Sequence, residues 1–314
     1  MPHSIAPLMT VKQSTNVFRY AEVWEPMAGG SRLQLSASST LDPDSGDITI
    51  PDAGETLEIG EGISGSAAKQ SDAVILQDEC VALNTARSRS GCDLTALVAI
   101  PVFDIGRLVS VVVFGLGEGF GGLEIWRPDE RHELSIQGSY YRGLSSFEYM
   151  SQYVRFPLGS GLPGACWSHS KPRIVDAPAT NGEFIRSFSK DPANLSSCCG
   201  LPIGWETGNS GSVLLMLSAE QKPLARFIDV VNISSKRPTD DLPKPILHCE
   251  ERKASPPGFA QRSWPESLMT KVAEERCAML VNTADHGLKI EAEKLVVIPF
   301  FNQGRITQLT GFWF

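Results

Sequence analysis

The feature that most constrains this chain is an internal repeat with a period of about 100 residues, the length of one small domain. The segment AEVWEP, which begins at Ala21, returns as LEIWRP at Leu123. The segment GEGISG, which begins at Gly60, returns as GSGLPG at Gly159. Such a repeat indicates that one supersecondary unit has been copied, so the fold of one copy predicts the fold of the others.

A third, shorter copy follows the first two. LVAIPVF, from Leu97, has counterparts in CGLPIG, from Cys199, and in KLVVIPFF, from Lys294. The third copy lacks the glycine motif and has PESLMTKVAEE instead, whose Pro265 near the first turn predicts a helix. The apolar segment ITQLTGFWF is expected to pack against another unit or another chain. The predicted units are residues 1–118, 119–222 and 223–314.

The connections between units look like β-hairpins. VSVVVFG is followed by LGEGFG and then GLEIWRP, which is a strand, a glycine-rich turn and a second strand. VLLMLSA, EQKPLA and RFIDVV repeat this pattern. The sequence therefore predicts neighbouring units joined edge to edge, with no flexible linker between them.

The glycine motif Gly159-x-Gly161-x-x-Gly164 resembles a dinucleotide-binding fingerprint, since a possible strand over 154–158 comes before it and Asp176 follows. Only ACWSHSKP separates Gly164 from the next strand, RIVD. A parallel crossover needs a dozen or more residues, so this segment is too short. The same motif returns in the first unit with an equally short continuation. We therefore interpret it as a structural turn shared by the units, and we expect no nucleotide cofactor.

Composition narrows the classes of function. The net charge is −8, which argues against nucleic-acid and membrane-surface partners, because both need clustered Lys and Arg. The seven cysteines are scattered without CxxC spacing, so reduced thiols and a cytoplasmic location are expected. The five histidines lack HxH and HExxH spacing. We expect no cofactor and no metal.

These motifs resemble those of the GAF domain family. The second unit carries the G-x-G-L-P-G-x-x-W pattern from Gly159 to Trp167, an acid at Asp176, Leu-Pro at Leu201 and a final strand from Gly211. The first unit matches more loosely, and the third only in its last strands. The resemblance implies an α+β fold of tandem GAF-like units. Each would have a central antiparallel sheet with helices on one face and a possible ligand cavity on the other.

The resemblance further implies a non-catalytic module that senses or binds a small molecule and signals through a partner. The ligand is not identified by the sequence, and the partner would be another protein or a second copy of the chain. The segments expected to roof the cavity of the second unit are rich in aromatic and polar residues, as ligand pockets are. The predicted ligand-binding residues are Tyr140, Tyr149, Trp167, His169, Phe184, Arg186 and Phe188.

Two alternatives remain open. One is a structural or protein-interaction protein with degenerate pockets, since no output segment is visible. The other is a thiol-dependent enzyme related to free methionine sulfoxide reductase, for which Cys166 and His169, one helical turn apart, are the best Cys–His pair. Ser64 and Pro163 stand where that branch of the family has a cysteine in the glycine turn, and no complete catalytic motif is present. We therefore predict that the protein is not an enzyme.

Overall fold

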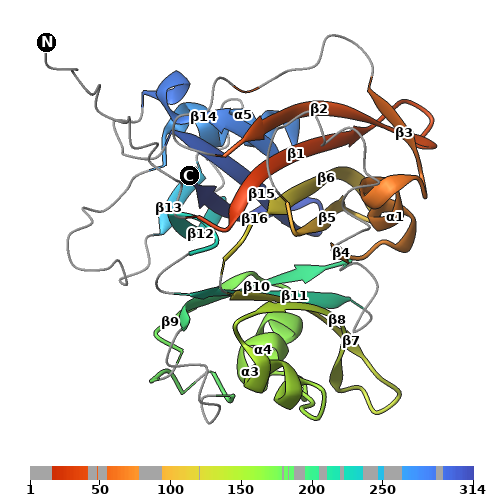
Figure 1. Ribbon diagram of the computed structural model, residues 1–314. Coiled ribbons are helices and arrows are strands. Elements are labelled where there is room, and N and C mark those ends of the chain that lie inside the picture. The colour runs from red at the N-terminus through yellow and green to blue at the C-terminus, as the bar shows by residue number, and fades with distance from the viewer. Residues whose placement is uncertain are drawn as a thin grey trace, which may run out of the picture.

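Three antiparallel β-sheets form most of the described chain (Figure 1). The structure is a computed structural model. It describes residues 16–41, 48, 55–77, 94–119, 121–178, 180–182, 184–186, 195–204, 211–219, 223–235, 247–250, 264–287 and 293–314. The helices are short and the sheets are antiparallel throughout, so the fold class is α+β, as predicted.

The first sheet has the strand order β3-β2-β1-β6-β5-β4. Its strands are β1 (Phe18–Pro26), β2 (Arg32–Thr40), β3 (Thr56–Glu58), β4 (Val74–Gln77), β5 (Ala96–Asp104) and β6 (Arg107–Leu116), and helix α1 (Gly62–Gln70) precedes β4.

The second sheet has the order β8-β7-β11-β10-β9. Its elements are β7 (Gly121–Pro128), β8 (Leu134–Arg142), α3 (Ser145–Ser151), α4 (Gly161–His169), β9 (Arg173–Asp176), β10 (Leu195–Ile203) and β11 (Ser212–Ala219).

The third sheet has the order β13-β12-β16-β15-β14. Its elements are β12 (Phe227–Ser235), β13 (Leu247–Glu250), α5 (Glu266–Glu275), β14 (Met279–Asn282), the 3-10 helix η3 (Thr283–His286), β15 (Lys294–Asn302) and β16 (Arg305–Trp313).

Apart from the extra strand β3, the three sheets share one strand order, and their registers make the positions equivalent. The proline of the Ile-Pro or Leu-Pro pair supplies the reference point in each sheet. The residue opposite this proline lies on the last strand of the sheet, and it also pairs with a residue of the first strand. That first-strand residue is Trp24 in the first sheet, Trp126 in the second and Val231 in the third. The division of the chain at residues 118/119 and 222/223 remains a prediction.

The sheets surround a common apolar core (Figure 1). One contiguous cluster of buried side chains draws on β1, β5 and β6, on β7, β10 and β11, and on β15 and β16. Phe18, Phe114 and Phe312 lie inside it with ring centroids 4.4–6.2 Å apart, and Phe314 packs 6.4 Å from Phe18. Such aromatic contacts add to the burial term. The prediction that ITQLTGFWF packs against another unit is confirmed.

Each sheet carries its helices on the face that points away from the common core. Helix α1 packs on the first sheet, α3 and α4 on the second, and α5 on the third (Figure 1). Three smaller apolar clusters fill these outer layers. The inner face of each sheet is therefore covered by its neighbours, and the outer face carries the segments that connect its strands.

The predicted hairpins between units are wrong. Strand β6 pairs with β1 and β5, and β7 pairs with β8 and β11, so both are interior strands of different sheets. Strands β11 and β12 are separated in the same way. Each strand already has two hydrogen-bonded neighbours, which leaves no edge for a hairpin partner. The glycines of this connection let the chain pass from one sheet to the next.

The glycine motif is a structural turn, as interpreted from the sequence. Gly159 and Gly161 have φ of +81° and +60°, and the Gly159 amide donates to the Gly164 carbonyl at 2.9 Å. A Cβ on Gly164 would lie 2.4 Å from the Pro157 carbonyl oxygen. Helix α4 begins inside the motif and ends after nine residues. The predicted strand over 154–158 is only an isolated bridge between Leu134 and Phe156.

Candidate functional site

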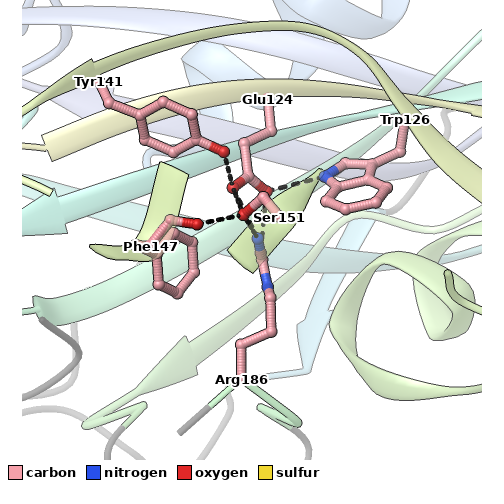
Figure 2. A network of polar contacts seen from close by, with 6 residues as sticks. All are labelled: Glu124, Trp126, Tyr141, Phe147, Ser151 and Arg186. Carbon is pink, nitrogen blue, oxygen red and sulfur yellow. Dashed lines mark hydrogen bonds and ion pairs between the residues drawn. The ribbon is translucent and has the colours of Figure 1, made fainter. Parts of the chain in front are cut away.

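A buried ion pair lies on the outer face of the second sheet, beneath α3 (Figure 2). Glu124 comes from the interior strand β7, and Arg186 comes from the segment between β9 and β10. Glu124 is fully buried and Arg186 is 2% exposed. Charged side chains are almost never buried this completely unless they are paired, so the environment of this pair decides what the site can do.

The carboxylate of Glu124 accepts hydrogen bonds from several sides (Figure 2). Arg186 grips it with both terminal nitrogens, at 2.6 Å to Oε1 and 2.8 Å to Oε2. The Tyr141 hydroxyl donates to Oε1 at 2.5 Å, and the Trp126 indole nitrogen donates to Oε2 at 2.8 Å. A two-nitrogen grip of this kind fixes the orientation of both groups as well as their distance.

Ser151 completes the polar network. Its hydroxyl accepts from Arg186 Nη1 at 2.6 Å. Its own proton has two acceptors in reach, the Phe147 carbonyl at 2.8 Å and Glu124 Oε1 at 3.1 Å. A buried network with its members satisfied in this way is rigid and selects one geometry.

Aromatic rings surround the Arg186 guanidinium. Its central carbon lies 4.1 Å from the ring centroid of Phe147, 5.2 Å from that of Trp126, and 5.5 Å from those of Phe156 and Phe184. We call these four residues the Arg186 cage. A cation at such distances from aromatic faces is attracted by the ring quadrupoles, and the attraction grows when water is excluded. The outer face of the second sheet is therefore built to hold a planar cation against an acid.

The network keeps its phenol protonated. Burial, together with the neighbouring Glu124 carboxylate, raises the pKa of Tyr141 well above its usual value. The Tyr141 hydroxyl is therefore a hydrogen-bond donor at every physiological pH and does not act as a base.

A signal for Glu124 exists in the repeated segment LEIWRP. In LEIWRP the acid stands two residues before the tryptophan, so both side chains lie on one face of the strand. The first unit has the same arrangement, in which Trp24 Nε1 donates to Glu22 Oε2 at 2.7 Å. Burying a charged carboxylate costs free energy unless the carboxylate is paired and hydrogen-bonded. The pair Glu-x-Trp therefore indicated this site, but the predicted ligand-binding residues did not include Glu124, Tyr141 or Ser151.

The structure brings some of the predicted ligand-binding residues together and separates others. Trp167, Phe184 and Arg186 share the outer layer of the second sheet. Tyr140 lies on the opposite face, in the common core, with its hydroxyl 2.7 Å from Thr95 Oγ1. Tyr149 is 64% exposed. His169 is exposed at the end of α4, and Phe188 lies outside the described residues.

The cysteines near this site are poorly placed for thiol chemistry. Cys166 is buried, and the Nδ1 atom of His169 is 2.9 Å from the Ala165 carbonyl and 2.8 Å from Ser168 Oγ. Burial raises the pKa of the Cys198 and Cys199 thiols above their usual range. A reactive cysteine needs an exposed, stabilised thiolate.

Among the described residues, no group of three or more His, Cys, Asp or Glu side chains could hold a metal ion. In the same part of the chain, every helix is too short or too polar to cross a membrane.

No family model matches the sequence, and no curated protein matches it. Among solved structures the chain is similar to a mutated NreA protein in nitrate binding site from Staphylococcus aureus, with 16% identity over 35% of this chain and 80% of that chain, at a TM-score of 0.28. It is similar to the A. aeolicus nlh2 GAF domain in an inactive state, with 19% identity over 32% of this chain and 59% of that chain, at a TM-score of 0.26.

It is also similar to free methionine-R-sulfoxide reductase from Neisseria meningitidis, with 16% identity over 35% of this chain and 56% of that chain, at a TM-score of 0.25. The structural neighbours thus include a GAF domain and a reductase, and they name no activity common to them all.

Proposed function

We propose that this protein is a non-catalytic, cytoplasmic binding module of the GAF type, and that its second sheet recognises a small organic cation. The observation that carries the proposal is the Arg186 cage closed by Glu124. Four aromatic rings and one buried carboxylate are a recognition set for a guanidinium or substituted ammonium group. In the described state Arg186 itself occupies this set.

A ligand of this class would replace Arg186 rather than enter an empty pocket. Arg186 belongs to the segment that connects β9 to β10, and it is part of neither strand. Removing a partner from a buried ion pair costs about 3–5 kcal/mol, but a ligand guanidinium restores the same contacts to Glu124. The apparent affinity is lowered by the fraction of molecules in which Arg186 fills the cage. Displacement of Arg186 on binding is the signal that a partner protein would detect.

The second candidate function is that of an interaction protein whose pocket is permanently filled. Two observations favour it. Arg186 already satisfies the cage, and Tyr149, Tyr153, Leu158 and Ile185 are exposed large apolar residues on the same side of the second sheet. On this view the ion pair has only a structural role.

The Arg186→Ala variant separates the two functions. We expect it to lose about 3–5 kcal/mol of unfolding free energy, because Glu124 stays buried without its cation. We expect millimolar methylguanidinium to restore part of that stability in a saturable manner, since it binds only the folded cage. Thermal unfolding monitored at several ligand concentrations measures both effects. Arg155→Ala is the matched control, because Arg155 lies on the same unit with its side chain 42% exposed.

Ligand binding to the wild-type protein distinguishes the sensing module from the interaction protein. Calorimetric binding of agmatine to the wild type, weaker than to Arg186→Ala but competitive with methylguanidinium, supports the sensing module. Rescue of Arg186→Ala without any binding to the wild type supports the interaction protein. Equal responses of Arg186→Ala and Arg155→Ala to methylguanidinium would reject the cage as a cation site.

A further inference from the structure

The three sheets meet at three equivalent junctions, each formed where a helix ends and an edge strand begins. Helices α1, α4 and α5 all end on a left-handed C-cap residue, Ser71, Ser170 and Arg276, with φ between 50° and 55°. The residue after each cap faces the next sheet around the core. In that neighbouring sheet it lies near two residues. One follows Trp24, Trp126 or Val231 on the first strand of the sheet, and the other lies on the last strand.

The first junction is closed by its own charges. Asp72, after the cap of α1, forms an ion pair with Arg127 of β7 at 2.5 Å and accepts a hydrogen bond from Ser212 of β11. The Ala73 amide also donates to Asp72, at 2.7 Å. The Asp72 carboxylate therefore finds all of these partners, Arg127, Ser212 and the Ala73 amide, within the protein.

The third junction is also closed. The Ala278 amide, after the cap of α5, donates to Ser110 Oγ of β6 at 3.0 Å. Cys277 Sγ lies 4.0 Å from Glu25 Oε1, and the cap residue Arg276 binds Asp104 at 2.5 Å.

The second junction departs from both. Lys171 stands where the first junction has Asp72, and Asn232 stands where it has Arg127, so the acid is missing and no ion pair can form between these positions. Gln308 of β16 takes the place of Ser212 and Ser110. Its amide nitrogen donates to Asn232 Oδ1 at 2.6 Å.

A proline removes the donor that the other junctions use. Pro172 occupies the position of Ala73 and Ala278 and has no N–H to give. Gln308 is 5% exposed, and within the described chain its Oε1 atom has no hydrogen-bond partner. A buried acceptor left in this state costs free energy, so a donor supplied from outside would be favoured there.

The second junction also contains a cavity of about 180 Å³. It is lined by His169, Lys171, Pro172, Arg173, Val230, Asn232 and Gln308. The lining therefore includes two positively charged side chains and a histidine, and none of these lining residues is an acid, in a chain whose net charge is −8. A cavity of about 150 Å³ holds a molecule the size of benzene, so this one admits about six to ten heavy atoms.

We infer that the second junction is a binding site for a small anion that carries a hydroxyl or amino group beside its charged group. Lys171 holds the carboxylate or phosphate, beside Arg173 and His169 in the lining. The neighbouring hydroxyl or amino group donates to Gln308 Oε1. The inference is independent of the cation site on the second sheet, because the two sites share no residue.

Calorimetric titration of the full chain with matched probes tests the site. Glycolate carries both features, acetate lacks the hydroxyl, and ethylene glycol lacks the charge. We expect glycolate to bind at least about 5-fold more tightly than acetate, which corresponds to one hydrogen bond to a buried acceptor, and we expect ethylene glycol not to bind. Glycerol 3-phosphate in a parallel titration shows whether the site prefers a phosphate to a carboxylate.

Two variants assign the binding to this junction. Lys171→Met keeps the aliphatic stem of an exposed side chain and should weaken glycolate binding at least about 10-fold. Gln308→Leu should reduce glycolate to the affinity of acetate. Lys69→Met, at the exposed end of α1, is the control and should change nothing. Equal affinities for glycolate and acetate, or equal binding by Lys171→Met and Lys69→Met, would overturn the inference, and so would an absence of heat with all four probes.

Discussion

The first and second junctions occupy equivalent places in two neighbouring sheets, and they differ in which charges they contain. The first pairs Asp72 with Arg127 and satisfies Ser212 and Ala73 around the same carboxylate. The second has Lys171, Pro172, Asn232 and Gln308 at these positions, and a cavity remains between them. The repeat therefore preserves the backbone positions of a junction but not its chemistry. Because no ion pair joins the Lys171 and Asn232 positions, the second junction keeps room for a ligand.

The largest effect is expected from breaking the closed junction. Asp72→Lys places a cation opposite Arg127 and removes the acceptor of both Ser212 and Ala73. We expect the unfolding free energy to fall by about 2–4 kcal/mol, because Asp72 is buried and its partners lose their hydrogen bonds. Chemical denaturation with urea measures the change. Glu130→Lys reverses an exposed acid and should cost less than about 0.5 kcal/mol. Equal costs for the two variants would show that the ion pair does not hold the junction.

An intermediate effect is expected from closing the open junction. Lys171→Asp combined with Asn232→Arg copies the first junction into the second. In a double-mutant cycle we expect a favourable coupling of about 0.5–1 kcal/mol, since the new pair is only partly buried. The double variant should also lose glycolate binding. Strictly additive single effects would mean that the junctions are not equivalent in geometry.

An effect of about the same size as the new pair is expected at the third junction. Ser110→Ala removes the acceptor of the Ala278 amide and should cost about 1 kcal/mol. Hydrogen exchange of that amide should become faster, whereas Ser145→Ala, an exposed serine on α3, should leave it unchanged. Unchanged protection in Ser110→Ala would place the source of that protection elsewhere.

Local patterns in the sequence predicted much of the fold. The Val- and Ile-rich runs became strands, PESLMTKVAEE became α5, and the glycine motif became a turn because Gly164 admits no Cβ. The predicted hairpins between units are wrong because alternating hydrophobicity and a glycine-rich turn show only where a strand lies and ends. They do not identify the strands that pair with it. Strand partners depend on contacts far apart along the chain.

The site was predicted only in part for a related reason. Aromatic richness selected Trp167 and Phe184, and Arg186 was included as a polar group of the same segment. Tyr140 and Tyr141 are adjacent residues on opposite faces of β8, and without the register the sequence could not say which one faces the helices. The Glu-x-Trp spacing pointed to Glu124, but the sequence could not show that Arg186 reaches it across 62 positions of the chain.

The common core has a consequence for synthesis of the protein. A ribosome releases the first two sheets long before β16, whose Phe312 packs with Phe18 and Phe114. Until then their inner faces, rich in Val, Leu and Phe, have no third wall and remain open to water and to other nascent chains. The common core can therefore be completed only after β16 has been synthesised. A cell that makes it must shield two incomplete sheets for the time that the third takes to be translated.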